Sequence, residues 1–371
     1  MGTPGGRMFF DGPSYSRLWE KSAIGIISDG QGISLTDCEV VFCRDHRSIN
    51  FEGIIDWKDY SRWLSDRVRD NPNILRESSV LEALRVPGNK VVLSENFEFF
   101  GYQAPGSWAL RWNSDCHPSR DEPVSEIVWF RSDDLLHEGD NDSKSSFGWL
   151  LNWCDQVNGR GRIPEVLVID EEQSVVTYRL SEADPLGKMG KPTNADFTTI
   201  NDLSSESQDN GVFIPEGSNW PLESIGIPLH GGRQLDSIEV ELISKYCSNQ
   251  ISGNEIGTNT VSMEGMNDGI SISARILSDL WLRGLNTRSG FKYGTTWRCY
   301  PGNLDEGHAP WLVVDPSKEG PSNWSEACLS SRLASGVNKN WIYPIYDRDG
   351  WRYLQISRPP SDSRWSNPRR T

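Results

Sequence analysis

The sequence lacks a surplus of positive charge. Its 371 residues include 37 Lys and Arg against 52 Asp and Glu, which gives a net charge of −15. Because phosphate binding calls for Lys and Arg, this balance argues against a nucleic-acid partner for the chain as a whole. The charge is uneven, however: residues 287–371 carry 12 basic and 8 acidic side chains, a balance of +4 that leaves −19 for residues 1–286. The asymmetry indicates either a basic working end on an acidic body or merely a basic tail.

The sequence also lacks cysteine pairs and long apolar runs. Its seven cysteines form no Cys-x-x-Cys motif, and their number is odd. This argues for reduced thiols, and against a zinc ribbon or a secreted disulfide scaffold. The first residues have no hydrophobic signal core, and no run approaches the ~20 apolar residues that a membrane span needs. We therefore expect a cytoplasmic protein with no membrane partner.

What is present is the composition of a folded protein. With 36% hydrophobic and 24% charged residues, the chain is typical of globular rather than disordered proteins. Its length allows two domains of ordinary size, each with a core of its own.

Three pairs of similar segments occur in the same order in the two halves of the chain. The first pair shares an Ile-Gly-Ile start, a Gly turn and an acidic amphipathic segment; the second resembles a helix, a Gly stop and a strand. The third pair is typical of a hairpin with an acidic turn. The pairs are 24–49 with 225–251, 80–101 with 276–294, and 164–181 with 339–357. Their common order favours an internal duplication.

We therefore predict an α+β fold of two tandem repeats. Each repeat would have a helical N-terminal part followed by a mixed β-sheet packed on helices. The first repeat spans residues 1–182, and the stretch 183–222 is rich in Gly, Pro, Ser, Asn and Asp, which predicts a linker or long loop. The second repeat has its N-terminal part at 223–272 and its sheet domain at 273–371.

A helix is expected in the last hundred residues. Asn323 followed by Glu326 is a plausible helix start, and Gly336 is a fitting stop. Leu329 and Leu333, four residues apart, would share one face of this helix.

Three polar residues lie at the ends of predicted strands. The strand "FKYGTTWRCY" ends at Tyr300, and "HAPWLVVD" begins the next strand at His308. The connecting loop is short, so the two side chains can lie at the same edge of the sheet. Lys339 lies in the turn before the strand "NWIYPIY", in which Pro344 suits an edge strand better than a central one. Element ends are where functional sites usually lie.

Together these residue types suit one reaction. Cleavage of RNA by its own 2′-hydroxyl needs a base on that hydroxyl, an acid at the departing 5′-oxygen and a cation beside the phosphate. His titrates near neutrality and Lys is a compact charge. A tyrosine is a poor base at its ordinary pKa near ~10 unless cations lie close to it. Taken singly, each of the three residues is more often structural than catalytic.

Another class of enzyme stays open at this point. The segment "VVDPSKE" offers Asp315, Lys318 and Glu319, residue types that hold Mg²⁺ in metal-dependent nucleases. Their crowding within one turn makes shared coordination of one metal difficult.

The segments "GFKYGTTWRCY", "GHAPWLVVD" and "SSRLASGVNKNWIYPIY" resemble the catalytic domain of tRNA-splicing endonucleases. The family pattern Gly-x-Lys-Phe/Tyr-Gly before a tyrosine is matched by residues 290–294 and Tyr300. Its His-Ala before a hydrophobic strand is matched at His308, and its Arg-x-Ala and Val-x-Lys by residues 332–339. The similarity covers roughly residues 273–357 and is faint elsewhere. A departure is Asn340, where many members carry a second basic residue.

The resemblance implies a reaction, with roles for residues. Members excise introns from precursor tRNA at bulge–helix–bulge motifs without a metal or other cofactor, leaving a 2′,3′-cyclic phosphate and a 5′-hydroxyl. Tyr300 would be the general base, His308 the general acid, and Lys339 would stabilise the charged transition state. A scaffold subunit that only binds RNA is disfavoured, because scaffold subunits of this family lose these residues.

RNA contacts are implied as well. Members clamp a bulged base between two cationic or aromatic side chains from the partner active unit. Arg332 matches the first clamp position. The second falls in the closing hairpin, at Arg348, Trp351 or Arg352.

The resemblance also implies an assembly. A chain with a degenerate front repeat and an active rear repeat looks like the archaeal homodimeric type, in which the front repeat is a structural pseudo-nuclease. The front half has no equivalent Tyr–His–Lys series, and no family motif surrounds His137. The acidic turn with Asp170, Glu171 and Glu172 occupies the place of a loop that docks into a basic pocket across the dimer interface. An ordinary solvated hairpin turn is the alternative.

Overall fold

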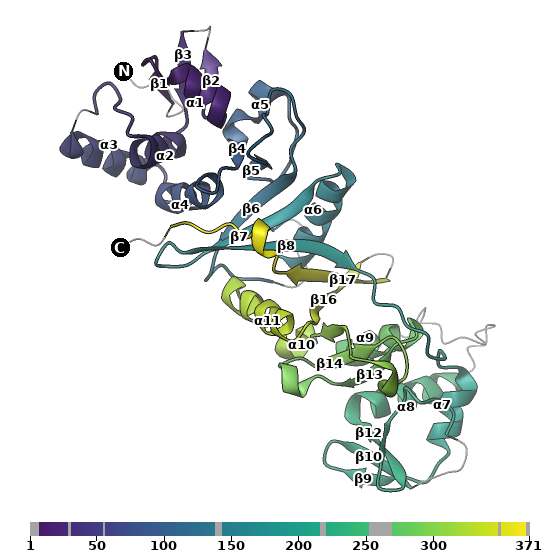
Figure 1. The fold of residues 1–371 in the computed structure, drawn as a ribbon. Helices are drawn as coiled ribbons and strands as arrows, with labels where there is room; N and C mark the ends of the chain where they lie inside the picture. Colours follow the sequence, from purple (N-terminus) through teal and green to yellow (C-terminus); the bar gives the residue numbers. More distant parts are fainter. Residues whose placement is uncertain are drawn as a thin grey trace. The chain divides into compact units, whose positions relative to one another are not determined.

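The computed structural model describes residues 7–28, 31–54, 56–137, 143–215, 220–251, 269–347 and 350–368, with only the backbone at 249–251 and 306. The chain forms two compact units, and Figure 1 labels most of their helices and strands. The first comprises Met1–Ser181, Asn323–Ser325 and Ser357–Thr371; the second comprises Glu182–Ser322 and Glu326–Ile356. Helices and sheets occur in both, which confirms the predicted α+β class.

The first unit begins with a small antiparallel sheet in the order β1-β3-β2. Helices α2 and α4 contact each other, and their apolar residues share one core with this sheet and with the larger sheet that follows. The elements are β1 (Met8–Phe10), α1 (Tyr15–Ser22), β2 (Ile26–Ser28), β3 (Gly32–Leu35), α2 (Asp37–Arg47), α3 (Trp57–Asp70) and α4 (Ile74–Arg85).

A buried carboxylate fixes the start of α2. The Thr36 hydroxyl accepts the Glu39 N–H at 3.3 Å, and Glu39 Oε2 accepts the Thr36 N–H at 3.1 Å, which forms a capping box. The other oxygen of Glu39 accepts the N–H of Gly25 at 2.9 Å. Gly25 has φ +74°, and a Cβ there would lie 2.9 Å from the Ser34 carbonyl oxygen. The turn therefore needs glycine.

The larger sheet of the first unit has the order β4-β5-β6-β7-β8. β6 and β7 run parallel because α6 crosses between them, and the other neighbours are antiparallel. The β7–β8 hairpin confirms the one predicted at 164–181. The elements are β4 (Lys90–Leu93), η1 (Ser94–Asn96), α5 (Phe97–Phe100), β5 (Ala109–Trp112), β6 (Ser125–Arg131), α6 (Phe147–Gly159), β7 (Ile163–Ile169) and β8 (Val175–Ala183).

The second unit has a sheet with the same plan. Its order is β13-β14-β15-β16-β17, with β15 and β16 parallel around α11 and the other neighbours antiparallel. The β16–β17 hairpin confirms the one predicted at 339–357. The elements are β13 (Asn286–Ser289), η2 (Phe291–Tyr293), β14 (Trp297–Tyr300), η3 (Leu304–Glu306), β15 (Trp311–Val313), α10 (Pro316–Glu319), α11 (Trp324–Gly336), β16 (Asn340–Asp347) and β17 (Gly350–Ser357).

The stretch 183–222, expected to be a linker or long loop, instead contains regular structure of the second unit. Thr193 and Asp196 form a capping box that starts α7, and β9 and β10 join a four-stranded sheet in the order β11-β12-β10-β9. The small polar residues that predicted a loop serve here as caps and turns. The elements are α7 (Asn194–Asn201), β9 (Glu206–Gln208), β10 (Gly211–Pro215), β11 (Ile227–Leu229), β12 (Gly232–Asp236), α8 (Ser237–Ile251) and α9 (Ile272–Leu282).

The helix start of the second unit repeats that of the first. Glu239 accepts the N–H of Gly226 at 2.9 Å and the N–H of Asp236 at 3.0 Å, while Asp236 Oδ1 accepts the Glu239 N–H at 2.9 Å. Gly226 has φ +67°, close to the +74° of Gly25. The pair of segments aligned in the sequence thus shares one hydrogen-bonding pattern.

α11 ends at Gly336 as predicted, and Leu329 and Leu333, which are 51% and 57% exposed, share a face that is turned to solvent. The position of Pro344 differs from expectation. Pro344 lies in β16, which has neighbours on both sides and is not an edge strand. The proline is tolerated because β15 pairs with residues 340–342 only, so no ladder bond is required of residue 344 on that side.

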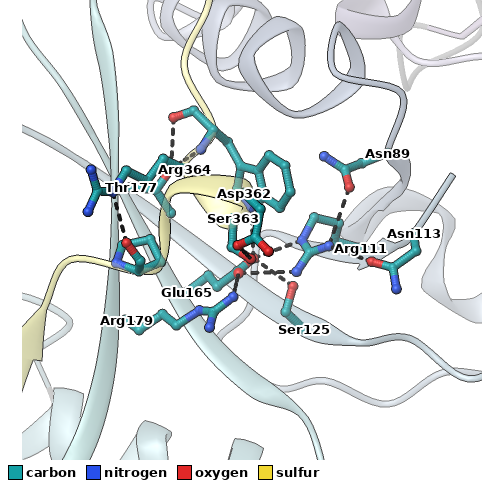
Figure 2. A network of polar contacts seen from close by, with 12 residues as sticks. Asn89, Arg111, Asn113, Ser125, Glu165, Thr177, Arg179, Asp362, Ser363 and Arg364 are labelled. Carbon is teal, nitrogen blue, oxygen red and sulfur yellow. Dashed lines mark hydrogen bonds and ion pairs between the residues drawn. The ribbon is translucent and has the colours of Figure 1, made fainter.

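A buried polar network holds the C-terminal segment against the rest of the first unit (Figure 2). Arg111 on β5 donates from Nε and Nη2 to Glu165 on β7, at 2.8 and 3.1 Å. The two side chains are 2% and 0% exposed. The Trp365 ring lies 4.8 Å from the Arg111 guanidinium, and its Nε1–H donates to Glu165 at 3.4 Å. Thr177 holds the same segment, donating to the Trp365 carbonyl at 2.8 Å.

Candidate active site

Tyr300 is the last residue of β14. Its backbone pairs with Asn286 of β13, and Pro301, which has no N–H to donate, ends the strand. The side chain is half-buried, and the guanidinium of Arg298 lies 5.8 Å from its ring centre. The phenol therefore projects from the end of the strand with a cation beside it.

His308 is exposed and comes three residues before β15. The next residue, Ala309, is buried and fixes the chain against the core. Because Cys299 of β14 pairs with Trp311 of β15, the end of one strand and the start of the other meet at one edge of the sheet. This is the edge at which Tyr300 and His308 were expected to meet.

The structure brings these two residues into one cavity. It measures about 220 Å³, room for a few water molecules or a phosphate group. The lining residues are Lys188, Tyr300, Pro301, Gly302, Asn303, Gly307 and His308. The cavity thus holds a phenol, an imidazole and an amine.

Lys339 reaches the same segment from the other side. Asn338, with φ +54°, ends the turn after α11, and the N–H of Lys339 bonds to the Ala334 carbonyl at 3.0 Å. Lys339 Nζ donates to the carbonyl of Ala309 at 2.5 Å and lies 5.4 Å from the ring centre of Tyr293. Its ammonium is therefore held one residue away from His308.

Lys188 also lines the cavity, although the sequence did not point to it as a site residue. It lies in the stretch expected to be a linker, where its backbone N–H bonds to the Pro301 carbonyl at 2.7 Å. The neighbouring Gly187 makes the approach possible, since a Cβ there would lie 2.0 Å from the Gly284 carbonyl oxygen. The only signal in the sequence is a lysine between two glycines, "GKMG".

The expected base-clamp residues have different surroundings. Arg332 is exposed on α11. Arg352 on β17 is paired with Glu182, to which it donates at 2.7 and 2.6 Å, and lies 3.6 Å from Asp347. This ion pair lowers the pKa of the Glu182 carboxyl. Arg348 lies outside the described residues.

Trp351 is the remaining clamp candidate. Its ring makes an edge contact with Tyr346 at 5.2 Å, and the guanidinium of Arg275 lies 5.8 Å from its centre. Arg275 also lies 4.6 Å from the Tyr346 ring. The indole is half-buried in this cluster, and Arg352 beside it is engaged in ion pairs.

The acidic turn expected at the dimer interface connects β7 and β8. Asp170 accepts the N–H of Ser174 at 2.8 Å and so shapes the turn, while Glu171 and Glu172 are exposed.

The alternative metal-binding segment has a structural arrangement. Asp315 is fully buried and caps α10, with Oδ1 accepting the N–H of Ser317 at 3.0 Å and Oδ2 accepting the hydroxyl of Ser273. Over the part of the chain that is described, no three His, Cys, Asp or Glu side chains are grouped as metal ligands. In the same residues, no helix combines the length and apolar character needed to cross a membrane.

Comparison with known proteins agrees with the resemblance seen in the motifs. The model of the family described as "tRNA intron endonuclease, catalytic C-terminal domain" matches residues 271–353. The tRNA-splicing endonuclease of Picrophilus torridus is 28% identical over 210 residues, which are 56% of this chain and 60% of the relative. That of Thermoplasma volcanium is 30% identical over 194 residues, 51% of this chain and 53% of the relative.

Other relatives are more similar over a shorter stretch. The tRNA-splicing endonuclease of Methanococcus vannielii is 40% identical over 76 residues, 20% of this chain and 43% of the relative. The chain thus spans about half the length of the curated relatives that it matches. For residues 271–353, the match to the family model confirms the resemblance to a tRNA intron endonuclease catalytic domain that the motifs indicated.

Proposed function

We propose that this chain is a cytoplasmic RNA endonuclease that excises introns from precursor tRNA at bulge–helix–bulge motifs. One observation carries the proposal: Tyr300 and His308 line a single cavity, and Lys339 is bonded to the residue that follows His308. The match of residues 271–353 to a tRNA intron endonuclease domain supports the same class of reaction.

The first half of the reaction is assigned to Tyr300. Its phenolate oxygen takes the proton of the 2′-hydroxyl, whose oxygen attacks the adjacent phosphorus. Arg298 lies beside its ring and Lys188 lines the same cavity, so two positively charged side chains are near the phenol.

The second half is assigned to His308 and Lys339. As the bond from phosphorus to the 5′-oxygen breaks, the protonated imidazole of His308 gives its proton to that oxygen, which leaves as a hydroxyl. The extra negative charge on the phosphate oxygens is stabilised by the ammonium of Lys339. The products are a 2′,3′-cyclic phosphate and a 5′-hydroxyl, and no step in this scheme uses a metal or other cofactor.

We also propose that the two units are repeats and that the first is degenerate. The two sheets have the same strand order and the same strand directions. In each unit a Glu at the start of a helix accepts the N–H of a Gly, Glu39 from Gly25 and Glu239 from Gly226. Trp112 ends β5 as Tyr300 ends β14, and Arg162 precedes β7 as Lys339 precedes β16. Glu122 lies three residues before β6, as His308 lies three residues before β15, so the two positions correspond. An indole cannot act as a base, so the first unit would not cut RNA.

A homodimer is part of the proposal. The exposed carboxylates Glu171 and Glu172, on the turn shaped by Asp170, would dock into a basic pocket of the partner. The two active sites of such a dimer would come from its two second units.

For the base clamp we propose Arg332 with Trp351. Arg332 is exposed, and an arginine plane or an indole can stack on an unpaired base. Arg352 is the weaker candidate, because it would have to release Glu182 first.

The proposal is tested by the products. A bulge–helix–bulge RNA incubated with the chain in excess EDTA should be cut at the two bulges, and the 5′ fragment should end in a cyclic phosphate. Cutting that requires added Mg²⁺ would favour the metal-dependent nuclease. Binding of the RNA with no cutting under either condition would favour the scaffold subunit.

A further inference from the structure

The first unit contains a cleft at the sheet edge that corresponds to the candidate active site of the second. It encloses about 500 Å³, which falls in the range of small-ligand sites. Its polar lining includes the residues that stand in the places of His308 and Lys339. The polar lining residues include Tyr102, Gln103, Arg120, Asp121, Glu122 and Arg162.

Two aromatic side chains hold the wall of this cleft in place. Trp112 is fully buried, and its Nε1–H donates to the carbonyl of Asp121 at 2.8 Å. The hydroxyl of Tyr102 donates to the same carbonyl and to that of Pro118, each at 3.2 Å. The rings of Trp112 and Tyr102 contact each other with centres 5.5 Å apart. The loop that carries Arg120 and Glu122 is thus fixed before any ligand arrives, which reduces the entropy lost on binding.

Arg162 is bonded to a buried carboxylate on its protein side and only weakly paired on the side that faces the cleft. Its Nη1–H donates at 3.0 Å to Glu126, which is fully buried, and its guanidinium lies 5.7 Å from the Tyr102 ring. On the open side it meets Glu122 at 3.4 Å, a carboxylate whose side chain is 83% exposed. An ion pair so exposed contributes little, so a ligand can replace Glu122 as the partner of Arg162.

Arg120 adds a second cation. It is exposed, and among the described residues no side chain is paired with its guanidinium. Close by, Asp121 is already engaged, since its Oδ2 accepts the N–H of His117 at 2.6 Å.

This set of groups selects a class of ligand. A simple anion would be attracted by Arg120 and Arg162 but repelled by Asp121 and Glu122. A nucleotide matches both signs, because its phosphate suits the guanidinium groups and its exocyclic amino group suits the carboxylate of Glu122. Its planar base can stack on the guanidinium plane of exposed Arg120 and contact the edge of the Tyr102 ring, which lines the cleft.

We propose that this cleft binds an unpaired nucleotide of the RNA, as a second contact that positions the substrate and takes no part in cleavage. The inference rests on the proposed function for the identity of the RNA. The cleft would be an active-site position converted to binding, with Arg162 in the place of Lys339 and buried Trp112 in that of Tyr300.

Binding can be measured with the full chain and a fluorescent bulge–helix–bulge RNA that carries 2′-deoxyribose at both cleavage sites. Arg120→Glu should weaken the Kd about tenfold, as expected for loss of a phosphate or base contact. The control is Arg62→Glu, which makes the same charge change at a side chain that is 69% exposed on α3. It should change the Kd less than about twofold, and both variants should keep the thermal unfolding midpoint of the wild type. Equal effects of the two variants, or no effect of Arg120→Glu, would overturn the inference.

A second measurement separates the cleft from the active site. The same RNA with 4-thiouridine in its bulges, irradiated on the wild-type chain, should cross-link to the tryptic peptide 91–111, which contains Tyr102. Cross-links confined to peptides around Tyr300 and His308 would refute the cleft while leaving the proposed function intact. If the chain cuts no RNA at all, the proposed function fails. Titration with guanosine monophosphate and with inorganic phosphate then tests the cleft alone: the nucleotide should bind the wild type more tightly than phosphate does, and Arg120→Glu should abolish the difference.

Discussion

The ammonium of Lys339 is bonded to the carbonyl of Ala309 at 2.5 Å. Through this bond a side chain that follows α11 is tied to the residue after His308, although the two lie about thirty positions apart in the sequence. The same ammonium also lies over the ring of Tyr293, 5.4 Å from its centre. The cation is thus placed before substrate binds, which is the condition for strong stabilisation of a developing charge.

Lys339→Ala should lower kcat by roughly 10²–10³, because one preorganised charge at the phosphate is lost. KM should change far less. Single-turnover cleavage rates check this, with Lys245→Ala on α8 as the control, since that lysine is exposed. A variant that keeps the wild-type rate would remove Lys339 from the mechanism.

Glu165→Ala should reduce the free energy of unfolding by about 3–5 kcal/mol, because it leaves the buried Arg111 without its carboxylate. The bond from Ser125 to this carboxylate (Figure 2) and the bond from Trp365 are lost as well. Urea unfolding measures the change, with Glu20→Ala on the exposed face of α1 for comparison. A loss similar to that of the control would mean that the network adds no stability.

Glu239→Gln should alter how stability depends on pH. Burial, with help from the charge of Asp236, raises the pKa of the Glu239 carboxyl from 4.5 to about 7. Between these values the folded state binds more protons than the unfolded state, so the stabilisation is complete below about pH 4.5 and is lost as pH rises through about 7. The variant should therefore lose less stability than the wild type between pH 5 and pH 8. The urea midpoints of unfolding at pH 5 and pH 8 measure this difference. The control Glu206→Gln, at an exposed side chain, should behave like the wild type.

Reversing Asp170, Glu171 and Glu172 to Lys should convert the proposed dimer to a monomer. Like charges would then face the basic pocket of the partner, which costs several kcal/mol and weakens association. Light scattering gives the mass directly, and Glu20→Lys is the control for charge alone. An unchanged mass would show that the turn is an ordinary solvated hairpin.

Local signals in the sequence predicted most elements near the site. The hairpin 339–357, the end of α11 at Gly336 and the meeting of β14 with β15 all follow from short-range patterns. The stretch 183–222 was mispredicted because its Gly, Pro, Ser and Asn residues are typical of loops, although Thr193 forms a capping box that starts a helix. Lys188 could not be placed for a different reason. Its position depends on backbone bonds to Pro301 and on the close approach of Gly187 to Gly284, which are tertiary contacts that no local pattern encodes.

The exposure of Leu329 and Leu333 shows a similar limit. Spacing places two residues on one helix face, but it does not tell which face the rest of the unit covers. The order of strands, which decides whether Pro344 lies at an edge, likewise depends on pairing between distant segments.

The central claim is that His308 donates a proton in metal-free cleavage. The most direct test compares wild type with His308→Ala on a bulge–helix–bulge RNA in excess EDTA. We expect the wild type to cut with a cyclic phosphate product, and the variant to cut at a rate lower by ~10²–10⁴, as for a lost general acid. An unimpaired variant, or a wild type that cuts only with Mg²⁺, would contradict the claim and leave His308 a structural residue.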